Sequence, residues 1–464
     1  MSRLIPRPHG RGLVALAIAL ILGACSQDST APRTPLAVLH VAGGDGNEAL
    51  VAQVRALAAG RGVTPLPRPP FVRPALSRLG QMLAFDPILS GNRDISCITC
   101  HHPRFATGDA RSLSIGQGAT GLGPDRVHPQ NAFIPRNAPA LFNLHAMQTM
   151  FWDGRVAGDQ LHGFHTPAGA QLTPAMTAVM EFGALSAQPL FPPTSHAEMR
   201  GDVGTNALAN IPDDRLDAIW AAIMGRLGRI PEYRALFEAA YPGRRFSQMN
   251  FAYASNAIAG FFLDRLTFDR SPWDHFIGGE DDALSPDQLL GARAFLSLKC
   301  SICHGGPAFT DNQFHNVAVA QLGPGEGDGT DGHDDFGRAR VTGADADRYL
   351  FRTTPLRNVE LTGPYGHDGA VVNLSDFVAH YSESDLKLRA YDTGQLEPLL
   401  QPTVLRDPDA ILATRDTLLR GVVLSDSLVD ALTTYLKALT DPRARRLMGL
   451  VPVRVPSGLP VGGR

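Results

Sequence analysis

Cysteine is scarce in this chain, with 5 in 464 residues, and there are only 3 tryptophans. So few cysteines exclude a small scaffold held together by many disulfides. The formal net charge of −3 lacks the basic excess that nucleic-acid binding requires. Signals for β-strands are also few, so we expect a mainly α-helical protein.

Four of the five cysteines lie in two C-x-x-C-H motifs, at residues 97–101 and 300–304. This is the attachment pattern of c-type haem, in which two thiols bond the porphyrin and the histidine binds iron. One such motif could also be a redox dithiol or half a zinc site. Zinc needs four ligands together, whereas these motifs lie far apart along the chain. The predicted haem ligands are Cys97, Cys100 and His101 for haem one, and Cys300, Cys303 and His304 for haem two.

The fifth cysteine, Cys25, follows a predicted signal peptide at residues 1–24. Three arginines precede an apolar run at residues 13–22, which is too short to span a bilayer. The string Leu-Gly-Ala before Cys25 resembles a lipoprotein cleavage box, and ordinary secretion is the alternative. We therefore expect a periplasmic protein that a lipid on Cys25 anchors to the outer membrane of a Gram-negative bacterium. All five cysteines are then used, and none remains for a disulfide.

The two motifs divide the mature chain into two predicted haem domains. The predicted segments are a lipid-anchored tether at 25–70, an N-terminal haem domain at 71–280, a C-terminal haem domain at 281–445 and a tail at 446–464. The tether contains a possible amphipathic helix around Leu50 and Leu57. With 47 glycines and 36 prolines, the loops between helices should be long.

Apolar spacing and end signals predict several helices. They run over residues 74–85, 213–227, 251–268, 286 to the second motif, 374–381 and 425–439. An acidic, glycine-rich stretch at residues 325–335 lacks the carboxylate spacing of an EF-hand. We expect it to be a solvated loop.

Several longer strings are similar to one family of bacterial enzymes. They are residues 79–87 (LGQMLAFDP), 136–139 (RNAP), 151–155 (FWDGR), 355–359 (PLRNV) and 361–365 (LTGPY). With the two motifs, the chain resembles the bacterial di-haem cytochrome c peroxidase and MauG family from about residue 79 to residue 439. The resemblance implies a peroxide-using enzyme with two haems in two cytochrome c-like, mainly helical domains.

The resemblance also implies a glutamate, with a glutamine nearby, on the distal side of haem one. Breaking the O–O bond needs a group that takes a proton from one oxygen and gives it to the other. The string Gln188-x3-Pro192-x5-Glu198 is similar to that pocket in residue types and spacing. We therefore expect Glu198 to be the acid/base, with Gln188 and Pro192 shaping the pocket. A surface carboxylate is the alternative for Glu198.

The sixth ligand of haem one departs from the family pattern. Many members carry a histidine there in the oxidised resting enzyme, whereas this chain has Gln117 at the matching position. A glutamine amide is a poor iron ligand, so haem one is expected to stay open without prior reduction. His128, His162 and His165 remain open as substitute ligands.

The sixth ligand of haem two also departs from the pattern. Typical peroxidase members use a methionine, but the only methionine after Cys303 is Met448, near the C-terminus. Counting forward from Pro364 places the ligand position on Tyr381, where MauG uses a tyrosinate. An anionic oxygen ligand lowers the potential of the haem. His380 remains the alternative ligand.

Two further roles follow from the resemblance. Trp152 matches the tryptophan that lies between the haems and relays electrons, and a buried aromatic anchor is the alternative. Asn137, Thr362 and Pro364 match a calcium site between the haems, built from one side-chain oxygen and two backbone carbonyls. Oxygen-only ligation suits Ca²⁺.

These expectations favour a di-haem c-type peroxidase that reduces hydrogen peroxide at the N-terminal haem with electrons relayed through the C-terminal haem. Its donor would be a small cytochrome or a cupredoxin. The alternatives are a MauG-like enzyme that oxidises residues of an exported partner protein, and a simple electron carrier. A long insertion at residues 157–185, with Gln117 and Tyr381, shifts weight towards the MauG-like branch. The oligomeric state stays open.

Overall fold

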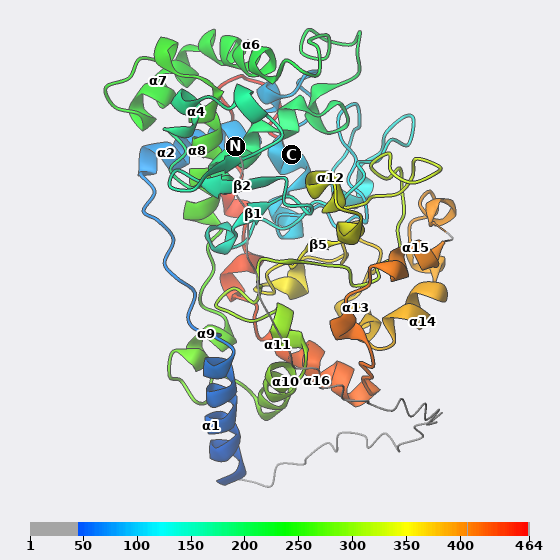
Figure 1. The fold of residues 1–464 in the computed structure, drawn as a ribbon. Coiled ribbons are helices and arrows are strands. Elements are labelled where there is room, and N and C mark those ends of the chain that lie inside the picture. The colour runs from blue at the N-terminus through cyan, green and yellow to red at the C-terminus, as the bar shows by residue number, and fades with distance from the viewer. Residues whose placement is uncertain (1–44, 406, 463–464) are drawn as a thin grey trace, which may run out of the picture. The chain divides into compact units, whose positions relative to one another are not determined.

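Helices joined by long loops make up most of residues 45–405 and 407–462, which this computed structural model describes (Figure 1). The predicted signal peptide and Cys25 lie outside the described residues. Within the described part, none of the helices combines the length and the apolar character that crossing a membrane requires. The prediction of a mainly α-helical chain with little sheet is confirmed.

The longer helices have seven to sixteen residues and the strands are all short. The longer helices are α1 (Asp45–Gly60), α2 (Pro74–Phe85), α6 (Leu216–Gly228), α7 (Pro231–Ala240), α8 (Phe251–Arg265), α10 (Pro286–Ser297), α13 (Leu374–His380) and α16 (Asp426–Lys437). The shorter helices are α3 (Cys97–Cys100), α4 (Pro174–Thr177), α5 (Ala184–Ala187), α9 (Pro272–Ile277), α11 (Cys300–Cys303), α12 (Ala339–Thr342), α14 (Ser384–Arg389) and α15 (Pro408–Ala413). The strands are β1 (Thr149–Met150), β2 (Val156–Asp159), β3 (Gly163–His165), β4 (Phe314–His315) and β5 (Phe351–Arg352). β1, β2 and β3 form an antiparallel sheet, and β4 pairs with β5 antiparallel.

The predicted helices are present, and local signals explain their ends. α2 has the predicted bounds and begins with a proline. Ser285 caps α10 through a capping box with Gln288. α6 begins three residues later than predicted, and Asp213 lies before it with its carboxylate 2.7 Å from the Arg200 guanidinium.

Each haem motif follows a helix that crosses a second helix at a glycine. In α2, a Cβ on Gly80 would lie 1.8 Å from the Ala257 carbonyl oxygen of α8. In α10, a Cβ on Gly291 would lie 2.0 Å from the Ala431 carbonyl oxygen of α16. Only glycine lets the two backbones approach so closely. The two halves of the chain therefore support their C-x-x-C-H turns in the same way.

Buried apolar side chains gather in two main clusters. The first runs from Val72 to Phe268 and also takes in residues 444–461. The second takes in residues 50–63, with side chains of α1, and residues 273–439, with side chains of α10 and α16. The change from the first cluster to the second, between Phe268 and Trp273, lies slightly before the predicted domain boundary between residues 280 and 281. That each cluster is a separate haem domain stays a prediction.

Both ends of the described chain pack onto these clusters. The predicted amphipathic helix is present as α1, where Val54 and Ala58 are fully buried and pack in the second cluster with α10. The C-terminal segment returns to the first cluster. There Ser457 Oγ donates to Asp86 Oδ1 at 2.6 Å, and the Gly462 amide donates to the Phe85 carbonyl at 2.9 Å.

Replacing Gly80 with alanine tests the helix crossing. The added methyl group would meet a backbone carbonyl that cannot move aside, so we expect a loss of about 1–3 kcal/mol in the free energy of unfolding. Denaturant titration of the holoprotein measures this loss. Gly225→Ala is the matched control, because Gly225 lies in α6 with nothing within 4 Å of the added Cβ. It should gain about 0.5–1 kcal/mol in helix propensity. Equal effects of the two variants would contradict the close crossing.

Candidate functional site

The two C-x-x-C-H motifs fold as single helical turns, α3 and α11. Ser96 caps α3 and forms a capping box with Thr99. The four cysteines of the turns are half-buried and make no disulfide. Free, accessible thiols one helical turn apart are what thioether attachment of a haem requires.

The two motif histidines are held in the same way. His101 Nδ1 lies 3.1 Å from the Thr107 carbonyl, and His304 Nδ1 lies 3.0 Å from the Phe309 carbonyl. A carbonyl can only accept, so we assign the proton to Nδ1 and the lone pair to Nε2. Burial lowers the pKa of both histidines, which keeps the rings neutral. Thiols and histidines together therefore fit two c-type haems.

Glu198 lies in a π-helical turn, His196–Arg200. The Ser195 hydroxyl accepts a hydrogen bond from the Glu198 amide at 3.3 Å. Burial raises the pKa of Glu198. The Glu198 carboxylate in turn raises the pKa of the Cys97 and Cys100 thiols, after the larger effect of their own burial. Glu198 is therefore half-buried and close enough to the thiols of the first motif for its charge to act on them, and its role stays a prediction.

The other two predicted pocket residues lie in the segment before Glu198. Gln188 begins a 3-10 turn, Gln188–Leu190, and Pro192 begins the next, Pro192–Thr194. Both side chains are half-buried. Phe191, between the two turns, is buried and contacts Phe151 with ring centres 6.3 Å apart.

Gln117 lies beside the Glu198 turn, but its side chain is already engaged. Its Oε1 accepts a hydrogen bond from Asn92 Nδ2 at 2.7 Å. His128 is buried, and its Nδ1 accepts the Gln130 amide at 3.1 Å. His162 is exposed and pairs with Asp159 on the β2–β3 hairpin, and His165 is also exposed.

Tyr381 and His380 lie at the C-terminal end of α13. Burial raises the pKa of Tyr381, and the Cys300 and Cys303 sulfurs add to the increase. Tyr381 therefore lies near the second haem motif. No residue in the described part hydrogen-bonds its hydroxyl, whereas His380 Nε2 lies 2.7 Å from the Val317 carbonyl.

Trp152 makes hydrogen bonds to two segments that lie far apart in the sequence. Its indole Nε1 donates to the Asn137 carbonyl at 2.9 Å, and its own carbonyl accepts the Arg352 amide at 2.9 Å. Asn137 lies in the loop between α3 and β1 in the first half of the sequence, and Arg352 lies in β5 in the second half. Trp152 is therefore joined to segments from both halves of the sequence.

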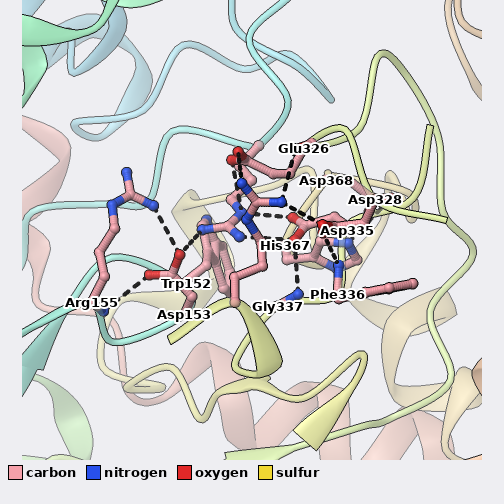
Figure 2. Close-up of polar contacts among 12 residues, drawn as sticks. Trp152, Asp153, Arg155, Glu326, Asp328, Asp335, Phe336, Gly337, His367 and Asp368 are labelled. Atoms are coloured by element: carbon pink, nitrogen blue, oxygen red, sulfur yellow. Dashed lines mark hydrogen bonds and ion pairs between the residues drawn. The ribbon is translucent and has the colours of Figure 1, made fainter. Parts of the chain in front are cut away.

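A buried ion network surrounds Trp152 (Figure 2). Arg136 Nη1 donates to Asp153 Oδ2 at 2.6 Å, and its Nε and Nη2 donate to the two oxygens of Asp335 at 2.6 and 2.8 Å. All three side chains are at least nine-tenths buried. Glu326 adds a contact to Arg136 at 3.5 Å. The network therefore joins three segments. Arg136 lies in the loop before Trp152, Asp153 directly follows Trp152, and Asp335 lies in the acidic loop of the second half.

One predicted calcium ligand, Asn137, lies in this region and is joined to the segment that follows Pro364. The Asn137 amide donates to the His367 carbonyl at 2.8 Å, three residues beyond Pro364. Asn137 Nδ2 donates to the Arg111 carbonyl at 2.9 Å, which leaves Oδ1 available. Asp368 is 1% exposed, and its Oδ2 has no hydrogen-bond partner within the described residues, although His367 Nε2 lies 3.7 Å away. These oxygens suit a hard cation.

The sequence reasoning missed the roles of Asp335, Asp153 and Arg155. It assigned residues 325–335 to a solvated loop, and this is wrong for Asp335, which is 2% exposed. The partner that buries Asp335 is Arg136, 199 positions earlier. Short motif strings contained Arg136, Asp153 and Arg155, but no spacing rule paired them.

Comparisons with known proteins agree with this geometry. The family model for di-haem cytochrome c peroxidase matches residues 74–282. The chain is 31% identical to cytochrome c551 peroxidase of Pseudomonas aeruginosa over 314 residues, which is 66% of this chain and 72% of that protein. It is 28% identical to the methylamine utilization protein MauG of Methylorubrum extorquens over 322 residues, 68% of this chain and 71% of that protein.

Solved structures of similar fold include a MauG-like protein associated with microbial copper homeostasis. That structure has a TM-score of 0.59 and 25% sequence identity, and the match covers 84% of this chain and 97% of that one. The diheme peroxidase BthA from Burkholderia thailandensis has the same fold, with a TM-score of 0.57, 20% identity and coverage of 84% and 90%.

Replacing Arg136 with glutamine tests the buried ion network. The change leaves two buried carboxylates without their cation, so we expect a loss of about 3–5 kcal/mol in the free energy of unfolding. Arg215→Gln is the control, because it breaks an exposed pair with Asp217 and should change stability little. Both are measured by chemical denaturation of the holoprotein. A loss no larger than that of the control would show that the network contributes nothing.

Proposed function

The chain belongs to the di-haem cytochrome c peroxidase family, and from this membership we propose that it reduces hydrogen peroxide at haem one with electrons relayed through haem two. Its relatives include proteins named cytochrome c peroxidases, which are oxidoreductases. The observation that supports this function best is the half-buried Glu198 carboxyl group, whose charge acts on the thiols of the first haem motif. A simple electron carrier has no use for such a proton-handling group.

The proposed chemistry divides between the cofactor and the chain. The haem supplies an iron that binds peroxide and exchanges electrons. Glu198 takes a proton from the oxygen nearer the iron and returns it to the far oxygen, which leaves as water. With two electrons and two further protons, one peroxide gives two waters. A pKa above that of an ordinary glutamate suits this role, because the group must both accept and release the proton.

The surrounding side chains have supporting roles in this proposal. Gln188 and Pro192 shape the pocket. Gln117 leaves the iron accessible, because its amide oxygen already accepts from Asn92. Trp152 relays electrons between the haems. Asn137, with the carbonyls of Thr362 and Pro364, holds a calcium ion.

We propose Tyr381 as the sixth ligand of haem two. Its hydroxyl is unpaired within the described residues, whereas the Nε2 of His380 lies within hydrogen-bond distance of Val317. A tyrosinate also favours the second candidate function, a MauG-like oxidation of a partner protein. The proteins named MauG among the relatives make this second function a direct alternative.

The remaining proposals concern location and partners. We propose a periplasmic enzyme anchored by a lipid on Cys25, because export agrees with covalent haem attachment. Its electron donor would be a small cytochrome or cupredoxin in the peroxidase function, and an exported protein would be the substrate in the MauG-like function.

Replacing Glu198 with glutamine tests the peroxide chemistry. The side chain keeps its shape but cannot accept the proton, so peroxide turnover should fall by roughly 10²–10⁴-fold. Turnover is measured with both haems present, as checked by the haem stain and the optical spectrum. Glu232→Gln is the control, because Glu232 pairs with Arg454 on a partly exposed surface. Unchanged turnover in Glu198→Gln would rule out its assigned role.

Replacing Tyr381 with phenylalanine or methionine separates the two candidate functions. Loss of the anionic oxygen should raise the potential of haem two, and methionine should favour the ordinary peroxidase cycle. Resonance Raman and magnetic circular dichroism report the ligand directly. His380→Gln is the matched variant and should leave the haem-two spectrum unchanged. A phenylalanine variant with the wild-type spectrum would show that Tyr381 is not the ligand.

A further inference from the structure

Arg352, in β5, is a buried arginine that no carboxylate of the described residues pairs with. The residue is 6% exposed. Its Nη1 donates to the Thr149 carbonyl at 3.3 Å, and no residue in the described part accepts a hydrogen bond from its Nε or its Nη2. Burial lowers the pKa of Arg352 to about 10, so the side chain is still charged at neutral pH.

The other buried arginines of the described part have the partners that Arg352 lacks. Some form an ion pair with a carboxylate, and the rest each donate to three backbone carbonyls. The first kind are Arg111, Arg136, Arg200 and Arg357, and the second kind are Arg126 and Arg226. A buried charge without a partner destabilises a fold strongly. The Arg352 guanidinium therefore suits an anion that is not part of the chain.

A second unused donor belongs to the residue that Arg352 contacts. The Thr149 hydroxyl is buried and has no hydrogen-bond partner within the described residues. A threonine hydroxyl can donate to an anion while its backbone carbonyl accepts from an arginine. The backbone amide of Arg352 donates to the Trp152 carbonyl at 2.9 Å. The two unused donors therefore belong to segments that flank Trp152.

β5 also lies against the segment that follows the second haem motif. Arg352 is paired with Phe314 of β4. The Thr353 amide donates to the Gln313 carbonyl at 2.9 Å, and the Asp311 amide donates to the Cys303 carbonyl at 2.8 Å. These bonds connect Arg352 to the motif through residues 311–314. A c-type haem carries two propionate carboxylates, so attachment at residues 300–304 would bring anions to this region.

We propose that Arg352, together with the Thr149 hydroxyl, binds a haem propionate and thereby fixes one edge of that haem beside Trp152. A guanidinium with two unused nitrogens is well suited to a carboxylate, because it can donate two parallel hydrogen bonds. The bonds to the Cys303 segment favour haem two as the source of the propionate, and haem one is the other source. The proposal rests on the two proposed haems, and it does not depend on the proton chemistry assigned to Glu198.

Resonance Raman spectroscopy of the holoprotein tests the contact. The propionate bending band responds to hydrogen bonds at the propionate, so Arg352→Gln should shift that band for one haem. Arg338→Gln is the matched control: its Nη1 donates to the carbonyls of Asp153 and Gly154, and its guanidinium lies 4.3 Å from the Phe314 ring. It removes a charge from the same region but should leave the band in place. An unmoved band in Arg352→Gln, with both haems attached, overturns the proposal.

Spectroelectrochemical titration identifies which haem supplies the propionate. Removing a positive charge beside a haem favours the ferric form, so the midpoint potential of that haem should fall in Arg352→Gln. Arg352→Lys should keep most of the potential because it keeps the charge. The larger fall at haem two or at haem one names the source. Two unchanged potentials overturn the proposal.

The stability of Arg352→Met gives an opposite sign for the two readings of this arginine. If the guanidinium binds a propionate, its loss leaves a carboxylate without its cation, so the denaturation midpoint of the holoprotein should fall. If the guanidinium has no anion, removing a buried unpaired charge should raise that midpoint, and this result overturns the proposal. None of these experiments measures turnover, so a failure of this proposal is distinguishable from a failure of the peroxidase function.

Discussion

The buried pairing of Arg136 with Asp153 and Asp335 is the constraint on which the centre of the molecule depends. One guanidinium satisfies two carboxylates from separate segments, and one of those carboxylates directly follows Trp152. Burying charges is costly, and only this near-complete hydrogen bonding offsets the cost. The pairing therefore fixes the loop around Trp152 against the acidic loop of the second half. Phe351 extends the same packing, since Arg136 lies 5.9 Å from its ring and His367 stacks on it at 3.7 Å.

The two halves of the chain support their C-x-x-C-H motifs in the same way. Gly80 and Gly291 permit the same close helix crossing, and His101 and His304 have the same carbonyl partner arrangement. The proposed distal residues differ: Glu198 lies in a π-helical turn, and Tyr381 lies at the end of α13. Since the supports match, we expect these distal residues to set the difference in chemistry between the two proposed haem sites.

Sequence reasoning identified features that depend on local signals. The proline that begins α2 and the capping box of α10 are local, and the haem motifs are contained within five residues. The Glu198 charge acts on the thiols of the first motif, while the acid/base role that the resemblance implies stays a prediction. What could not be predicted depends on distance along the chain. Asp335 carries no local mark of burial, because its partner lies 199 positions away. The short strands β4 and β5 are set by tertiary packing and have too few residues to show alternation.

Asp153 joins two arginines directly beside Trp152, the proposed electron relay. Its carboxylate accepts hydrogen bonds from Arg136 and from Arg155, and its neighbour is Trp152. Burial alone would raise its pKa, but the two guanidiniums outweigh burial and lower that pKa to about 2. The stability that this pairing contributes is therefore present above the ordinary pKa of aspartate and is lost only as pH falls towards 2. Asp153 thus stays charged where an ordinary aspartate would take up a proton, so its hydrogen bonds to Arg136 and Arg155 persist in mildly acidic solution.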